Sequence, residues 1–295
     1  MKKTAPRQKL ITITTLLILL SMLTLVFGAP LLRVLRKSFG PLAYWLIGAL
    51  VVGAAWALDA QPFAAVIGAV WMTLGAYNEC EEKGIGWWIS GVFSLTAGFA
   101  ALFAGAVVSL MKNGVNTYAE VVKIMESFSQ KVTEMNPVVK LDPEVLTQQI
   151  PSAMVIVLIL ALGLGLIYER RVFSWLGLPR EKTASQLKLL EYRVPDYFIW
   201  IAMTAFLLTM VSFGGKAIAI LAVNIVNVSV VLYFFQGLAV LEVFLYSMRA
   251  GLFTRILTYL IMVGQLMLIL SVIGLIDYWV DFRRRIRKLM LAGNN

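Results

Sequence analysis

Long apolar runs separated by short polar segments occupy most of the chain. A helix needs about 20 residues to cross the hydrocarbon core of a bilayer, and eight runs approach that length. The pattern predicts an all-α fold, a polytopic transmembrane helical bundle of about eight spans. The predicted spans lie near residues 10–30, 42–58, 61–79, 87–111, 151–168, 197–213, 217–247 and 253–280.

Three of these runs carry further expectations. Only Asp59–Pro62 separates the second and third runs, which predicts a tight helical hairpin. The seventh is too long for one perpendicular crossing, so it should tilt or break near Gln236 and Gly237. The first imitates a secretory signal. Phe27 and Pro30 make a poor cleavage site, so we expect an uncleaved span.

A polar insertion over residues 113–150 interrupts the apolar pattern. Its apolar residues recur at helical spacing and charged residues fill the opposite face, which predicts an amphipathic helix that ends at Asn136–Pro137. Asp142 and Pro143 then indicate the N-cap and first turn of the next helix. This helix is either a lid over a membrane cavity or an interfacial tether between two spans. The tether is favoured because amphipathicity alone indicates only an interface.

Composition agrees with a protein solvated by lipid. The chain is 60% hydrophobic and only 14% charged, whereas ordinary soluble domains carry about 25% charged residues. We expect one integral membrane domain over residues 1–295, with the insertion at 113–150, a basic loop at 170–195 and a basic tail at 282–295.

The formal net charge of +10 gathers in short basic clusters between apolar runs. That arrangement is typical of contact with anionic lipid head groups and of cytoplasmic orientation signals. We therefore expect the lipid bilayer, and not a nucleic acid, as the partner. The basic run 283–288 follows the last apolar run directly and indicates an anchor at the membrane surface.

Groups able to carry catalysis are scarce. The chain has no histidine and a single cysteine, Cys80, which excludes an internal disulfide and histidine-based catalysis or metal binding. We expect no catalytic residue, no metal and no cofactor, and a protein that is not an enzyme. Glu79, Glu81 and Glu82 surround Cys80, but no second carboxylate cluster completes a hard-cation site, so we expect a solvated loop there.

Polar side chains inside the predicted spans are candidates for function because they are costly in hydrocarbon. In a continuous seventh helix, Asn224, Asn227 and Glu242 share one face, whereas Gln236 points elsewhere. Gln265 adds an amide in the eighth run. These five side chains could line a path or site for a small molecule or ion. Alternatively, the amides hydrogen-bond neighbouring helices and Glu242 is an interfacial carboxylate.

Three stretches, 190–196, 224–240 and 274–283, resemble the YybS-like family of bacterial multi-pass membrane proteins, a domain-of-unknown-function family. The resemblance is most specific over 188–285. The family is grouped by remote similarity with the substrate-binding membrane subunits of energy-coupling-factor transporters. It implies a bacterial inner-membrane helical bundle with a small-molecule pocket, which would borrow separate ATPase and coupling transmembrane subunits. The motif residues, without an established role, are Arg193, Pro195, Asp196, Asn224, Gln236, Gly237, Asp277 and Arg283.

The residues themselves allow physical interpretations of this motif. Pro195 should stop a helix, with Asp196 near the start of the next one, where a carboxylate favours the helix dipole. Asp277 and Arg283 could form an ion pair. Two functions follow as hypotheses. One is the small-molecule-binding membrane component of a transporter, and the other is a non-transporting membrane scaffold or accessory or assembly factor.

Overall fold

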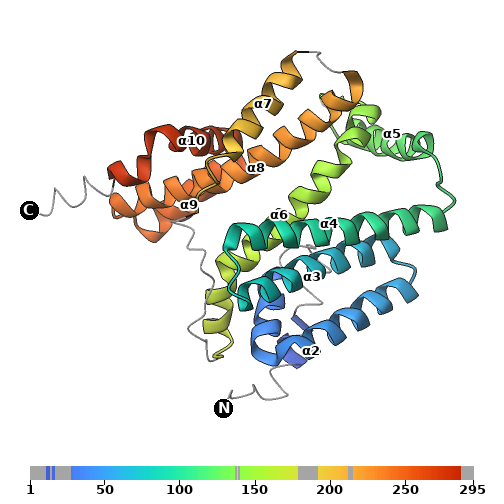
Figure 1. The fold of residues 1–295 in the computed structure, drawn as a ribbon, viewed down its shortest axis with the longest axis horizontal. Coiled ribbons are helices and arrows are strands. Elements are labelled where there is room, and N and C mark those ends of the chain that lie inside the picture. Colours follow the sequence, from blue (N-terminus) through green and yellow to red (C-terminus); the bar gives the residue numbers. More distant parts are fainter. Residues whose placement is uncertain are drawn as a thin grey trace, which may run out of the picture. The chain divides into compact units, whose positions relative to one another are not determined.

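The computed structural model describes residues 11–13, 15–16, 28–136, 138, 140–178, 192–211 and 215–286, and all the regular structure in them is helical (Figure 1). The predicted all-α class is therefore confirmed. The helices are α2 (Ala29–Ala57), α3 (Gln61–Glu82), α4 (Trp87–Lys112), α5 (Tyr118–Met135), α6 (Pro143–Trp175), α7 (Phe198–Met210), α8 (Gly215–Ser247), α9 (Leu252–Gly264) and α10 (Met267–Val280).

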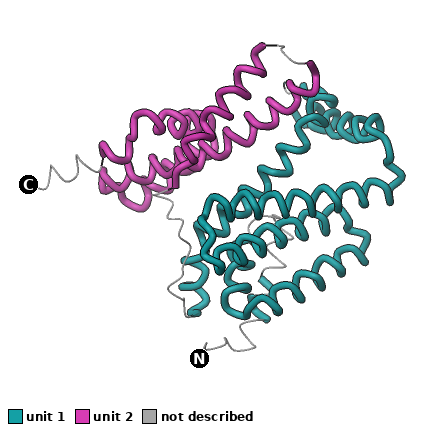
Figure 2. Tube along the Cα trace, viewed as in Figure 1, with its two compact units in different colours: residues 1–186 teal, residues 187–295 magenta. Residues whose placement is uncertain are grey.

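The helices belong to two compact units (Figure 2). Unit 1 covers residues 1–186 and contains α2 to α6, and unit 2 covers residues 187–295 and contains α7 to α10. The single integral membrane domain stays a prediction. Residues 170–175 of the expected basic loop are helical, as the last turns of α6, and residues 179–191 lie outside the described ranges.

The count of about eight spans is not supported. Among the described residues, α2, α4, α6 and α8 are long and apolar enough to cross a membrane, and the bent pair α9 and α10 raises the number to five at most. The run 197–213 forms α7, which has only 13 residues. The run 61–79 forms α3, whose last turn is polar from Asn78 to Glu82. The first run, 10–30, lies mostly outside the described residues.

A kink divides α2 at Gly40. The backbone there has φ 85° and ψ 176°, and Pro41 follows it. Glycine tolerates a positive φ, and proline lacks the N–H that would continue the helix. Residues 29–36, before the kink, are buried, whereas the part after it exposes apolar side chains. The predicted span at 42–58 is this second part, and the turn at Asp59–Ala60 gives the predicted hairpin with α3.

The last two predicted spans differ from expectation in opposite ways. α8 runs through Gln236 and Gly237 as a continuous helix of 33 residues, so the suggested break there is wrong. The eighth run is instead divided at Gln265–Leu266, where α9 and α10 meet at 95°. The glycine in α8 serves close packing and not a bend.

Close packing of α8 on α10 depends on two facing glycines. A Cβ added to Gly237 would overlap the backbone carbonyl of Leu270, and one added to Gly274 would overlap the carbonyl of Tyr233. Small residues let helix backbones approach this closely. The α3–α4 pair uses the same device, because a Cβ at Gly98 would overlap the Thr73 side chain.

We expect Gly237→Ala to destabilise unit 2 by about 1–3 kcal/mol, the usual range for an overpacked core. The new methyl group meets backbone atoms of α10, which cannot rotate away as a flexible side chain could. The loss would be measured by unfolding in detergent. Gly91→Ala in α4 is the control, because its Cβ would meet nothing within 4 Å and the change should be neutral or stabilising. Equal stability of the two variants would contradict this packing.

The predicted amphipathic helix is confirmed as α5, and its start is a reciprocal cap. Thr117 Oγ1 accepts a hydrogen bond from the Glu120 N–H at 3.3 Å. The Glu120 carboxylate accepts from the N–H groups of Asn116 and Thr117 at 2.7 and 2.9 Å. The predicted start of the next helix is also confirmed, since Asp142 accepts from the Glu144 N–H at 2.8 Å.

The cap predicts a pH dependence of α5. The hydrogen bonds from Asn116 and Thr117 lower the pKa of Glu120 below its ordinary value. The carboxylate therefore stabilises the first turn above about pH 4.3, its unfolded-state pKa, and this contribution is lost as the pH falls through the lower folded-state pKa. Hydrogen exchange at residues 116–120 should lose protection over that window. Glu120→Gln should be less protected at neutral pH and lack the acid step, and an unchanged acid step would refute the cap.

Candidate functional site: two buried polar networks

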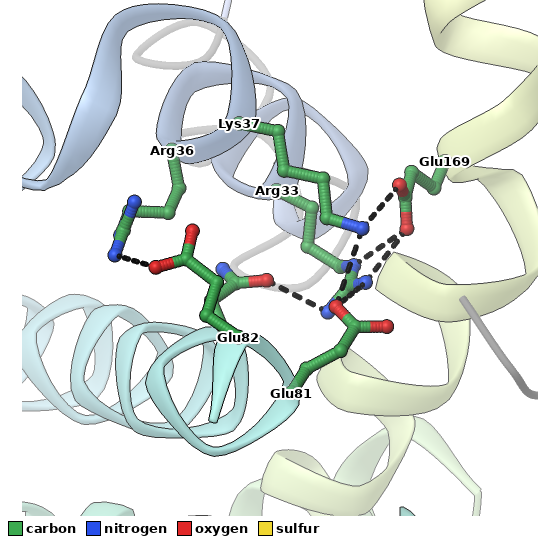
Figure 3. Close-up of polar contacts among 7 residues, drawn as sticks. Arg33, Arg36, Lys37, Glu81, Glu82 and Glu169 are labelled. Carbon is green, nitrogen blue, oxygen red and sulfur yellow. Dashed lines mark hydrogen bonds and ion pairs between the residues drawn. The ribbon is translucent and has the colours of Figure 1, made fainter. Parts of the chain in front are cut away.

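The first network is a charge cluster in unit 1, where the start of α2, the last turn of α3 and the end of α6 meet (Figure 3). The helix α2 supplies Arg33, Arg36 and Lys37, which lie on one side of it because residues three and four apart are neighbours. The α3 side chains are carboxylates and an amide, and α6 adds one carboxylate. We name this set the charge cluster: Arg33, Arg36, Lys37, Asn78, Glu79, Glu81, Glu82 and Glu169.

Arg33 is the centre of the charge cluster. Its side chain is fully buried, and Nε donates to Glu169 Oε2 at 2.8 Å. Nη1 donates to Asn78 Oδ1 and Nη2 to Glu81 Oε2, both at 2.9 Å. The ring of Tyr77 lies 5.3 Å from the guanidinium carbon. One side chain thus joins three helices, which suits the fixed fork of donors on a guanidinium.

The other two cations extend the cluster to its edge. Lys37 Nζ lies 2.9 Å from Glu169 Oε1 and 3.2 Å from Glu81 Oε2. Arg36 Nη2 lies 2.7 Å from Glu79 Oε1 and 2.9 Å from Glu82 Oε2, at the more exposed end.

The solvated loop expected around Cys80 is therefore wrong. These carboxylates belong to the last turn of α3 and pair with cations, and the Glu81 side chain is only 13% exposed. A hard-cation site would need a second carboxylate cluster opposite them, whereas their partners on α2 are basic residues more than 40 positions earlier. The basic spacing at 33, 36 and 37 is the signal that could have located the cluster.

The charge cluster is a set of ion pairs that holds α2, α3 and α6 together. Buried charges are stable only when paired and hydrogen-bonded, and removing one partner is strongly destabilising. Each carboxylate has at least one oxygen within ion-pair distance of a basic side chain, so the chain's own cations compete with a hard metal ion for these carboxylates. Within the described ranges, no group of three or more acidic or thiol side chains is arranged to hold a metal ion.

The second network lies in unit 2 and joins α8, α10 and the segment before α7. Gln236 Oε1 accepts from the Val194 N–H at 2.9 Å, and Nε2 donates to Asp277 Oδ2 at 3.3 Å. Arg283 donates to the same Asp277 oxygen from Nη2 at 2.8 Å, and from Nη1 to the Tyr192 carbonyl at 2.7 Å. The predicted Asp277–Arg283 pair is confirmed. Arg283 is buried, so it is not available to lipid head groups as the expected anchor would require, whereas Arg284 is exposed.

Four motif residues therefore meet at one place. Gln236, Asp277 and Arg283 form the network, and Gly237 lets α10 approach closely enough for it. Arg193 and Asp196 lie in the neighbouring turn with their charged atoms 3.6 Å apart, and their side chains are 42% and 70% exposed. The carbonyl of Pro195 accepts from the N–H of Phe198, at the start of α7, as expected for a residue just outside a helix.

The five predicted ligand residues are not brought together. Asn224 lies twelve residues before Gln236 in α8, about 18 Å along the helix, and its amide donates to the Ile220 carbonyl of its own helix at 2.8 Å. Asn227 is half-buried on α8, one turn from Asn224. Gln265 is exposed at the end of α9.

Glu242 makes a separate contact between α8 and α9. Its Oε2 accepts from the Tyr259 hydroxyl at 2.6 Å, and Oε1 lies 3.4 Å from Arg255 Nη1. The side chain is 24% exposed, so it is neither fully buried nor free in solvent. Both carboxylate oxygens are engaged within the chain, which leaves Glu242 as a link between two helices.

Unit 1 also has an apolar groove between α2, α3 and α4. Its volume is about 350 Å³, and its lining includes Trp45, Ala49, Trp56, Gly68 and Ala101. None of the predicted site residues contributes to it. The groove is thus separate from both polar networks.

Comparison with known proteins gives a family and no characterised relative. No curated protein and no solved structure matches the chain. The model of a family described as "Predicted membrane protein (DUF2232)" matches residues 7–278. That range covers nearly the whole chain, including the charge cluster and all of the second network except Arg283, and the apolar helices α2, α4, α6 and α8 agree with it. The chain belongs to this family of predicted membrane proteins, DUF2232.

Proposed function

We propose that this multi-pass membrane protein is a non-transporting scaffold or accessory factor. The main observation behind this proposal is that the polar side chains expected to line a path form hydrogen bonds and ion pairs with other residues of the same chain. Gln236 uses both ends of its amide on Val194 and Asp277, and Glu242 uses both oxygens on Tyr259 and Arg255. Such side chains hold helices together and leave few groups to recognise a polar solute.

The charge cluster supports the same proposal. It fixes three helices of unit 1 through ion pairs that a moving gate would have to break, at several kcal/mol per buried pair. A rigid bundle suits a protein that positions partners in the membrane. Anionic lipid head groups are the expected contacts of the exposed basic residues, such as Arg284 and Arg285.

The alternative is the small-molecule-binding membrane component of a bacterial inner-membrane transporter. One observation favours it: the residues that carry the resemblance to the YybS-like family, Gln236, Asp277 and Arg283, converge on one buried network. A component of this kind would work with separate ATPase and coupling transmembrane subunits.

Native mass spectrometry of the gently purified full chain separates the two. The scaffold proposal expects a stoichiometric protein partner without nucleotide-hydrolysing subunits, and the same partner bound to the double variant Asn224→Leu, Asn227→Leu. The transporter alternative expects ATPase subunits and a bound metabolite that this variant loses. Loss of a metabolite by a variant that unfolds like the wild type would overturn the scaffold proposal.

A further inference from the structure

The apolar groove of unit 1 lies between α2, α3 and α4, of which α2 and α4 are candidate membrane spans. The nearby Leu46 and Leu50 on α2 are 56% and 72% exposed, so this surface suits contact with the interior of a bilayer. The molecules in contact with such a surface are lipid chains. Neither candidate function uses the groove, so its occupant is a separate question.

The walls of the groove are fixed by the fold. The indole N–H of Trp71 donates to the Tyr44 carbonyl at 3.1 Å, and the Tyr44 hydroxyl donates to the Trp71 carbonyl at 2.5 Å. A Cβ at Gly48 would meet the Trp71 ring at 2.5 Å, so this glycine seats the indole against α2. A Cβ added to Gly68, in contrast, would have no neighbour closer than 3.4 Å, so this glycine leaves space in the groove.

A hydrocarbon chain suits the size and lining of the groove. The volume of about 350 Å³ lies between apolar and small side chains, and a single hydrocarbon chain is narrow and flexible enough to enter such a space. A partner helix bound over the groove is the competing occupant.

A charged pair marks the end of the groove nearest the α2–α3 turn. Lys112 Nζ lies 2.8 Å from Asp59 Oδ1, and both side chains are well exposed. Trp56, which lines the groove, is three residues before Asp59. Tryptophan and charged side chains at the end of an apolar surface are typical of the head-group level of a membrane.

We propose that the groove holds one hydrocarbon chain of a bilayer lipid, with its head group at the level of the Asp59–Lys112 pair. The chain lies along Trp45, Ala49 and Ala101, and the head group is in reach of the exposed ammonium of Lys112. The groove is thus a lipid site of unit 1, and it is independent of whether the protein is a scaffold or part of a transporter.

Photocrosslinking in nanodiscs tests this site with the full chain. The probe is a phosphatidylglycerol that carries a diazirine in one acyl chain, and peptides are mapped by mass spectrometry. Label should concentrate on the groove by about tenfold over the exposed apolar face of α7, which corresponds to about 1.4 kcal/mol of preference. Ala101→Phe, which fills the groove, should remove that excess. Ala100→Phe is the matched control, because Ala100 is exposed on the same helix and does not line the groove.

The results that overturn the proposal are specific. Label spread evenly over exposed apolar positions would indicate ordinary solvating lipid. An excess that persists in Ala101→Phe, or a protein crosslinked at the groove in place of lipid, would also refute it. If Ala101→Phe fails to fold, Ala49→Phe fills the groove from the opposite wall and is judged by the same readout.

Discussion

Arg33→Met is expected to lower the free energy of unfolding by about 3–5 kcal/mol, the range for removing one partner of a buried ion pair. The methionine retains much of the side-chain volume but none of the donors. Glu169, whose side chain is 1% exposed, loses its Arg33 pair and keeps only Lys37, and Asn78 loses the donor to its side-chain oxygen. Thermal or denaturant unfolding of the purified protein in detergent would measure the loss.

Arg193→Met provides the matched control for this prediction. Arg193 is also paired, with Asp196 at 3.6 Å, but its side chain is 42% exposed, and exposed pairs contribute about 0–1 kcal/mol. The double variant Arg33→Met, Glu169→Leu should be less destabilised than the two single effects added together, because it no longer leaves one charge of the pair buried alone. If Arg33→Met were as mild as Arg193→Met, the charge cluster would not be what joins α2, α3 and α6.

Features encoded by neighbouring residues were predictable from the sequence. The helix α5 follows from the spacing of its apolar face, and its C-cap at Asn136 and the start of α6 at Asp142 follow from residues with strong local preferences. The α2–α3 hairpin follows from a turn of only a few residues between two apolar runs. In each case the residues that decide the structure lie within one or two helical turns.

The number of spans was not predictable in this way. Hydropathy finds apolar runs, but it does not tell a membrane crossing from a short apolar helix such as α7. No proline in the sequence indicates the 95° bend between α9 and α10. The continuous path of α8 through Gly237 depends on the packing of α10 against that glycine. These outcomes depend on tertiary contacts, which single-run patterns do not contain.

The same limit applies to the polar residues. The sequence placed Asn224, Asn227 and Glu242 on one face of a helix, but the partners of Glu242 come from α9. The charge cluster joins residues up to 136 positions apart. The Asp277–Arg283 pair could be predicted from the sequence because the two residues are only six positions apart. The resemblance to a family selected Gln236, Asp277 and Arg283 among its motif residues, and only the fold shows that these three form one network.

Asp277→Asn is expected to destabilise unit 2 by about 3–5 kcal/mol, because the variant leaves the guanidinium of Arg283 buried without its counter-ion. The side chains of the pair are 1% and 9% exposed, so solvent replaces little of the lost interaction. The amide that replaces the carboxylate at position 277 also offers Gln236 Nε2 only a neutral oxygen as its hydrogen-bond acceptor. Since Gln236 accepts from the Val194 N–H, hydrogen exchange at Val194 should lose protection together with the global stability.

Two further variants decide whether the effect of Asp277→Asn comes from the network. Arg284→Met removes a neighbouring but exposed charge, and it should stay within about 0.5 kcal/mol of the wild type. Asp277→Asn combined with Arg283→Met should be less unstable than Asp277→Asn alone, because no unpaired charge is then buried. Should the double variant lose the full sum of both single effects, the pair would contribute through packing, and the network would not be the electrostatic link between α8, α10 and the segment before α7.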